Sequence, residues 1–264
     1  MFYALFLLVT FIILAFVLYH WQFYMLFRPT YYKNRKLHED CRLLEINREK
    51  NIVLEGVIYE PKDSKATLLL FVGRSHDAVA LIDKLRSCYP HYRVMAFNYR
   101  GYGESQGVID EKNMLQDALE IAALVEKNYG SFYLLGFSLG SNVAAYVASK
   151  REVKALFLIG AFDSLASLIR MRVKGSILEH INLSIFLRYR LDTAQYTQKV
   201  TAPTYLFASS SDSVTPLESA KLLKKSIYNL CHYSELDNVT HQELLWVPEV
   251  REKISALVDS LSKQ

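Results

Sequence analysis

The chain has 264 residues, of which 51% are hydrophobic, and a formal net charge of +4. This length suffices for one large domain with a substantial core. Three cysteines are too few, and odd in number, for a disulfide framework, and their spacing fits no metal site. We therefore expect no bound metal. No basic stretch interleaved with aromatic residues is present, so we also expect no nucleic-acid partner.

The hydrophobic excess lies at the N-terminus. Residues 1–27 contain no Asp, Glu, Lys or Arg. An uncharged apolar run of this length predicts a helix that crosses a bilayer, with Trp21, Phe23 and Tyr24 as an aromatic belt at the interface. A cleaved signal peptide is the alternative, but no basic residue precedes the run and no small-residue cleavage site follows it. We therefore expect a retained, single-pass anchor.

Positive charge follows the anchor directly. The basic residues of this flank are Arg28, Lys33, Arg35, Lys36 and Arg42. Because positive flanks stay on the cytoplasmic side, we predict that the N-terminus lies outside and the rest of the chain faces the cytoplasm. In this interpretation residues 28–41 form a polar linker, and residues 42–264 form the folded domain.

Beyond the linker, short apolar strands alternate with helices. Two strands at 42–46 and 52–59, separated by a charged turn at 47–50, predict an antiparallel hairpin. Further strands are expected at 66–72, 93–97, 132–137, 155–159, 204–207 and 231–236. Helices are expected at 78–88, 112–127, 141–149, 217–226 and 247–261. This alternation predicts an α/β fold in which a mostly parallel central sheet carries helices on both faces.

Residues 163–200 break the alternation. They contain six basic residues against three acids and offer no clear strand. We expect a short helical cap, inserted after the 155–159 strand. Two interpretations stay open: the cap binds substrate or the membrane, or it is a helical excursion with a solvated basic face.

The pentapeptide Gly136-Phe137-Ser138-Leu139-Gly140 lies between a predicted strand and a small-residue helix. Strand, tight turn and helix together are the setting of a nucleophile elbow, which holds a serine hydroxyl above the edge of the sheet. The glycines suit it because side chains at those positions would collide with neighbouring backbone. Ser138 is therefore the candidate nucleophile.

A serine nucleophile needs a base, and the base needs an acid that orients it. On sheets of this kind they follow in the order serine, acid, histidine. Asp212 is the single acid in the loop after the next-to-last predicted strand, and His241 lies in the loop after the last one. Asp163 is a rival acid and His76 a rival base, but the order of the loops favours Asp212 and His241.

An acyl-transfer site also needs two N–H donors for the oxyanion. The backbone of Leu139, directly after the serine and at the start of a helix, is one candidate. The second is the backbone of Arg74, in the loop after the 66–72 strand, where Gly73 permits a sharp turn. For the Arg74 side chain we consider three roles: facing solvent, binding an acidic group of the substrate, or pairing with Asp77.

Residues 97–105, Phe-Asn-Tyr-Arg-Gly-Tyr-Gly-Glu-Ser, resemble the N-x-R-G-x-G-x-S loop of α/β-hydrolase-fold serine hydrolases. With the pentapeptide, the segment 212–216 and His241, the resemblance covers nearly the whole region after the anchor in the expected order. It is greatest to membrane-anchored members with a minimal cap, in which a basic, Leu-rich segment ends in a motif like residues 190–193, Arg-Leu-Asp-Thr. The segment 72–75, Val-Gly-Arg-Ser, departs from the His-Gly or Gly-Gly start usual in relatives.

The resemblance implies hydrolysis of carboxylic esters or thioesters through Ser138, Asp212 and His241, without a metal or organic cofactor. Some eukaryotic relatives remove palmitoyl groups from proteins. The anchor and the basic cap suggest substrates met at an anionic membrane surface, such as lipid esters or acylated proteins. Two alternatives stay open. The same triad serves peptidases and acyltransferases, and a non-catalytic, membrane-tethered binding protein can share the fold.

Overall fold

The computed structural model describes residues 2–48, 52–176 and 183–262. Part of the turn predicted at 47–50, and part of the predicted cap including His180, lie outside the described residues. The described helices are α1 Phe2–Leu26, α2 Ile82–Cys88, α3 Glu111–Tyr129, α4 Leu139–Ala148, α5 Leu165–Val173, the 3-10 helix η3 Leu183–Phe186, α6 Thr193–Thr197, α7 Leu217–Ser226 and α8 Pro248–Leu261. The described strands are β1 Cys41–Asn47, β2 Val53–Tyr59, β3 Thr67–Phe71, β4 Arg93–Phe97, β5 Tyr133–Phe137, β6 Leu156–Ile159, β7 Thr204–Ser209 and β8 Leu230–Leu236.

The strands within the described residues form one sheet in the order β1-β2-β4-β3-β5-β6-β7-β8. β1 and β2 pair antiparallel, as the predicted hairpin requires, and β2 is also antiparallel to β4. From β4 through β3 to β8 every pair is parallel. The prediction of a mostly parallel sheet with an antiparallel start is confirmed.

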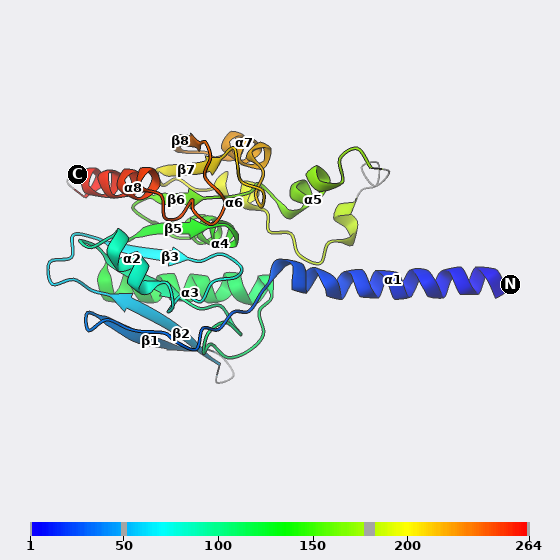
Figure 1. Cartoon of the computed structure of the whole chain (residues 1–264), viewed down its shortest axis with the longest axis horizontal. Helices are drawn as coiled ribbons and strands as arrows, with labels where there is room; N and C mark the ends of the chain where they lie inside the picture. Colours follow the sequence, from blue (N-terminus) through cyan, green and yellow to red (C-terminus); the bar gives the residue numbers. More distant parts are fainter. Residues whose placement is uncertain (1, 49–51, 177–182, 263–264) are drawn as a thin grey trace.

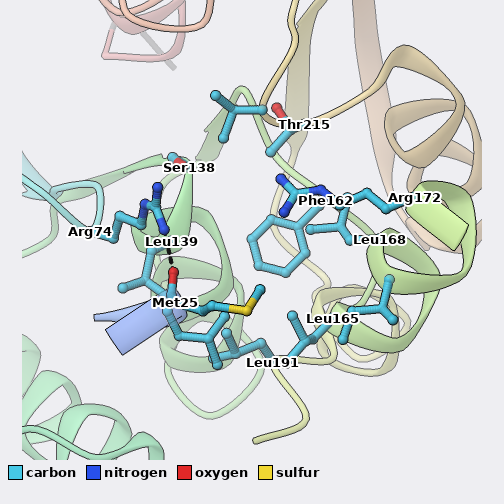
Figure 2. A pocket seen from close by; sticks show the side chains of 13 residues that line it. Met25, Arg74, Ser138, Leu139, Phe162, Leu165, Leu168, Arg172, Leu191 and Thr215 are labelled. Atoms are coloured by element: carbon cyan, nitrogen blue, oxygen red, sulfur yellow. Dashed lines mark hydrogen bonds between the residues drawn. The ribbon is translucent and has the colours of Figure 1, made fainter. Parts of the chain in front are cut away.

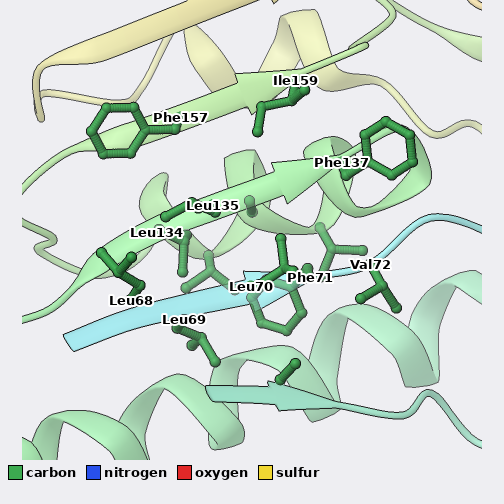
Figure 3. Packing of buried hydrophobic residues seen from close by; sticks show 14 of the residues in the cluster. Leu68, Leu69, Leu70, Phe71, Val72, Leu134, Leu135, Phe137, Phe157 and Ile159 are labelled. Atoms are coloured by element: carbon green, nitrogen blue, oxygen red, sulfur yellow. The ribbon is translucent and has the colours of Figure 1, made fainter. Parts of the chain in front are cut away.

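The central strands are apolar along their whole length because both faces of the sheet are covered. Leu68, Leu69 and Leu70 of β3 are completely buried, and their side chains interleave with those of β5 (Figure 3). Truncating one such leucine to alanine typically costs about 2–5 kcal/mol. This packing holds the carboxyl ends of β3 and β5 side by side, at the edge where the candidate nucleophile lies.

Helices lie on both faces of the sheet, as predicted (Figure 1). α4 packs on β5, β6 and β3 and against α3, which shares its face. Asp110 directly precedes α3, and its side chain accepts a hydrogen bond from the amide of Asn113; Gly130 directly follows the helix. This start is a helix N-cap, which satisfies one of the amides that the first turn leaves unpaired.

The predicted anchor is helical over Phe2–Leu26 and projects away from the α/β body (Figure 1). Its segment Leu5–Leu26 has a mean hydropathy of 2.1, and none of the apolar window is buried within the chain. A helix of 25 residues is about 37 Å long, which exceeds the ~30 Å of a bilayer's hydrocarbon core. α1 is therefore long and apolar enough to cross a membrane.

The segment predicted as a polar linker is mostly exposed but is tied to the domain by polar contacts. The guanidinium of Arg35 lies 2.6 Å from a carboxylate oxygen of Glu55 and 3.6 Å from one of Asp77. The amide of Tyr32 also donates to Asp77, at 3.2 Å. Because the Arg35 side chain is only 11% exposed, these contacts fix the segment to the body of the protein.

The region 163–200, predicted as a cap, contains α5, η3 and α6 in its described part. In Figure 1, α5 and the start of the domain after α1 lie at the same end of the sheet, beyond the carboxyl ends of β3 and β5. Helical structure here, and its position beyond the strand ends, put this region next to the candidate site.

Candidate functional site

Ser138 occupies a sharp turn between β5 and α4. Its backbone has φ 55° and ψ −119°, a conformation that side chains rarely adopt and that costs about 1–3 kcal/mol. Gly140 allows the turn because a Cβ there would overlap the carbonyl of Phe71 in β3. A Cβ at Gly136 would lie 2.6 Å from the carbonyl oxygen of Gly140. The strained serine is thus held by close backbone packing on both sides of it.

Three side chains that the sequence singled out form a continuous hydrogen-bonded chain. The Oγ of Ser138 lies 2.9 Å from Nε2 of His241, and Nδ1 of His241 lies 2.6 Å from Oδ2 of Asp212. The side chains of His241 and Asp212 are 6% and 1% exposed. His241 and Asp212 come from the loops after β8 and β7, so the parallel sheet brings His241 next to Ser138, 103 positions away in the sequence, and next to Asp212, 29 positions away.

Asp212 is held as a carboxylate. Burial alone would raise its pKa, but the hydrogen bonds from His241 and Thr215 hold the pKa below the ordinary value for an aspartate. Its Oδ1 accepts from the amides of Val214 and Thr215, both at 2.8 Å, and its Oδ2 accepts from the Thr215 hydroxyl at 2.6 Å. With its charge retained, the carboxylate favours His241 carrying a proton on Nδ1, which leaves Nε2 free to accept from Ser138.

The rival residues make other contacts. The carboxylate of Asp163 accepts a hydrogen bond from the hydroxyl of Ser219, at 2.6 Å. The ring of His76 packs against Phe137 with the ring centres 5.5 Å apart, and burial lowers the pKa of His76. In the described part of the chain, neither residue hydrogen-bonds to Ser138 or His241. The geometry therefore agrees with the preference for Asp212 and His241.

The two candidate oxyanion donors lie beside the serine. Leu139 is the first residue of α4, and Figure 2 shows Leu139 and Arg74 next to Ser138. Among the described residues, no acceptor is hydrogen-bonded to the backbone N–H of either one, so both stay free for a ligand. The Arg74 side chain is exposed, as one of the three roles considered requires, and it donates to the carbonyl oxygen of Met25 at the edge of the pocket (Figure 2).

A mainly apolar pocket opens at Ser138, with a cavity volume of about 80 Å³. α5 contributes Leu165, Leu168, Ile169 and Arg172 to its lining, so part of the region predicted as a cap does face the site. The last turn of α1 contributes Met25 and Leu26, opposite α5 in Figure 2.

Sequence reasoning missed Thr215 and the two α1 residues. The spacing Asp-x-x-Thr over 212–215 is a signal for Thr215, because an aspartate often accepts hydrogen bonds from groups two and three residues further on. Nothing in the apolar pattern of α1 distinguishes Met25 and Leu26 from the other residues of the helix. Their place in the pocket depends on how α1 meets the domain.

Comparison with known proteins agrees with this architecture. The family description "alpha/beta hydrolase fold" matches residues 71–178. The esterase Pf2001 of Pyrococcus furiosus has a similar structure, with a TM-score of 0.69 and 16% sequence identity, covering 88% of this chain and 96% of the esterase. A membrane phospholipase A, described as a bacterial virulence factor, gives a TM-score of 0.65 and 18% identity, covering 85% of this chain and 88% of that protein. The chain has the α/β-hydrolase fold.

Proteins of similar sequence include an uncharacterized viral protein and a lipase. An uncharacterized protein of Acanthamoeba polyphaga mimivirus, R595, is 25% identical over 72% of this chain and 71% of its own length. The lysophosphatidylserine lipase ABHD12 of Danio rerio is 24% identical over 54% of this chain and 41% of its own length. This chain therefore spans less than half of the lipase that it matches. Esterase, phospholipase and lipase names thus occur among the similar proteins.

Proposed function

We propose that this chain is a membrane-anchored serine hydrolase that cleaves carboxylic esters or thioesters through Ser138, His241 and Asp212. The observation that carries the proposal is the unbroken chain of short hydrogen bonds from Ser138 to Asp212, with the serine on a strained turn. A serine outside such an arrangement is a poor nucleophile near neutral pH. The esterase and lipase names among the similar proteins favour the same chemistry.

In the proposed reaction, Oγ of Ser138 attacks the carbonyl carbon of the substrate while its proton passes to Nε2 of His241. The carbonyl oxygen becomes an oxyanion, to which the backbone N–H groups of Leu139 and Arg74 donate. His241 then gives the proton to the departing alkoxide or thiolate as its bond to carbon breaks. Asp212 keeps the imidazole oriented and stabilises its positive charge.

The second half of the reaction regenerates the enzyme. Water attacks the acyl group on Ser138 and transfers a proton to Nε2 of His241. The bond between Oγ and the acyl carbon then breaks, Oγ takes the proton back, and a carboxylic acid leaves. The balanced products are one alcohol or thiol and one acid per water consumed, with no redox step.

The proposal is tested by fluorophosphonate labelling and ester turnover. We expect the Ser138→Ala variant to lose both, because the nucleophilic oxygen is absent. Ser213→Ala is the matched control, since Ser213 lies in the exposed part of the loop that carries Asp212. Persistent labelling or turnover in Ser138→Ala, with intact folding by circular dichroism, would contradict the assignment.

Lipid esters and acylated proteins are the proposed substrates, and residues 163–200 are proposed to be the cap of the 42–264 domain. The apolar helix α1 and the phospholipase-like fold support substrates that are met at a membrane. A reporter enzyme fused after Gln264 tests the proposed orientation. We expect reporter activity only in the cytoplasm, because the basic residues from Arg28 onward follow the apolar helix; activity on the opposite side of the membrane would overturn this topology.

A further inference from the structure

The end of the proposed membrane helix forms part of the wall of the candidate active site. Met25 and Leu26, in the last turn of α1, line the same pocket as Ser138. Opposite them, Leu165 and Leu168 of α5 complete an apolar space (Figure 2). An anchor that served only as a tether would not need to contribute side chains here.

This end of α1 is joined firmly to the domain. The side chain of Arg74 donates to the carbonyl of Met25, and the amide of Arg28 donates to the carbonyl of Arg74 at 3.2 Å. Phe27 is 1% exposed, and its ring meets that of Tyr189 edge-on with the ring centres 5.1 Å apart. Hydrogen bonds and ring packing therefore hold the last turn of the helix against the folded domain.

The region of the proposed cap is also tied to α1. The side chain of Gln22 accepts from the amide of Arg188 at 2.8 Å and donates to the carbonyl of Phe186 at 3.0 Å. The guanidinium of Arg188 lies 4.8 Å from the ring centre of Tyr19. Ile185 is 72% exposed and Phe186 is 48% exposed. Apolar side chains of η3 are thus presented beside the helix that would enter the bilayer.

The spacing of Trp21 and Met25 along α1 predicts how far the pocket lies from the membrane interface. Trp21, in the expected interfacial belt, is four residues before Met25, so the pocket wall lies about 6 Å further along the helix axis. The cavity volume of about 80 Å³ is roughly six times the volume that a cavity needs to hold one water molecule. A short run of methylene groups fits inside it, and a longer chain has to continue along the exposed apolar side chains of α1.

We propose that Met25 and Leu26 form the acyl-chain wall of the site, so that the anchor itself selects substrates with a long acyl chain, which reach Ser138 from the bilayer along α1. The proposal rests on the proposed hydrolase function and adds the specificity-determining residues. It accounts for an apolar pocket whose two sides come from α1 and α5. The occupant is the fatty acyl chain of an ester or thioester embedded in the membrane.

The test measures the acyl-chain preference of the full-length protein in detergent micelles, with p-nitrophenyl esters from acetate to palmitate. We expect Met25→Trp, which fills the cavity, to lower the ratio of kcat/KM for palmitate to that for acetate at least tenfold. Leu8→Trp is the matched control, because Leu8 lies on the same helix, 55% exposed and far from the pocket. It is expected to leave the ratio unchanged.

A second variant distinguishes a change of the pocket from misfolding, because it should shift the chain-length preference in the opposite direction. Met25→Ala widens the cavity and is expected to move the preference towards longer or branched chains, opposite to Met25→Trp. If both Met25 variants keep the chain-length profile of Leu8→Trp, the inference is wrong while the hydrolase assignment stands. If the unmodified protein neither hydrolyses any ester nor reacts with a fluorophosphonate at Ser138, the proposed function itself fails.

Discussion

Replacing Thr215 by valine tests how Asp212 is held. Valine has nearly the same shape as threonine but cannot donate to Oδ2, which accepts the Thr215 hydroxyl at 2.6 Å. The Asp212 side chain is 1% exposed, so water cannot replace the lost donor. A hydrogen bond to a charged group contributes about 1.5–3 kcal/mol. The free energy of unfolding should fall by about this amount, and the melting temperature by roughly 3–10 °C.

Activity should fall as well. The carboxylate would keep its two backbone donors, from Val214 and Thr215, but would lose the hydroxyl that shares Oδ2 with His241. If about half of the lost interaction serves to orient the imidazole, kcat/KM falls about three- to tenfold, since 1.4 kcal/mol corresponds to a factor of ten. Thr215→Ser is the control, because it retains the hydroxyl and should stay near the unmodified protein in both measurements.

The pH dependence of stability distinguishes the loss of a hydrogen bond to the charged Asp212 from a loss of packing. The pKa of Asp212 is lower in the folded chain than in an unfolded one, so its contribution to stability is complete above the ordinary aspartate pKa of about 3.9 and is lost as the pH falls through the folded value. Removing the donor raises the folded pKa. The stability difference between the unmodified protein and Thr215→Val should therefore be constant from pH 7 to pH 5 and shrink below pH 4, as urea unfolding would measure. A difference that persists unchanged into acid would refute this reasoning.

Three further predictions concern other parts of the structure. Gly140→Ala should cost about 1–3 kcal/mol and reduce fluorophosphonate labelling, because its Cβ overlaps the carbonyl of Phe71; labelling at the normal rate would speak against the described turn. Gln22→Leu should make the amide of Arg188 exchange about two- to tenfold faster in hydrogen-exchange measurements, since that amide loses its acceptor. Burial lowers the pKa of His76 in the folded chain, so the unmodified protein should lose stability as the pH falls from 7 to 5 and His76→Leu should lose less; equal losses in urea unfolding would exclude this role.

Much of the fold was predictable from local patterns. Continuous apolar runs such as that of β3 predicted buried parallel strands, because a strand covered on both faces needs no polar residue. The pentapeptide around Ser138 predicted the strained turn, because glycines at 136 and 140 are the residues that such close packing admits. Chain order favoured Asp212 and His241 over Asp163 and His76, and these two residues lie in hydrogen-bond contact with each other and with Ser138, since parallel strands deliver their following loops to one edge.

Other features depend on contacts between segments distant in the sequence. The segment predicted as a polar linker proved to be fixed to the sheet, because Arg35 meets Glu55 and Asp77 only once the chain has folded. The Arg74 side chain is exposed, as one expectation had it, but its hydrogen bond to the carbonyl of Met25 was not expected. Neither partner can be identified from spacing along the chain.

By itself, the sequence determined the class of fold, the apolar N-terminal helix and which serine, histidine and aspartate could act together, because each depends on periodicity, on a short motif or on the order of the loops. Only the tertiary structure decided what surrounds them. It places Thr215 on Asp212 and brings Met25 and Leu26 to the pocket beside Ser138. The physical reason is that the packing of whole elements makes a pocket wall. The local sequence pattern of α1, of α5 or of the strands does not show how these elements pack against one another.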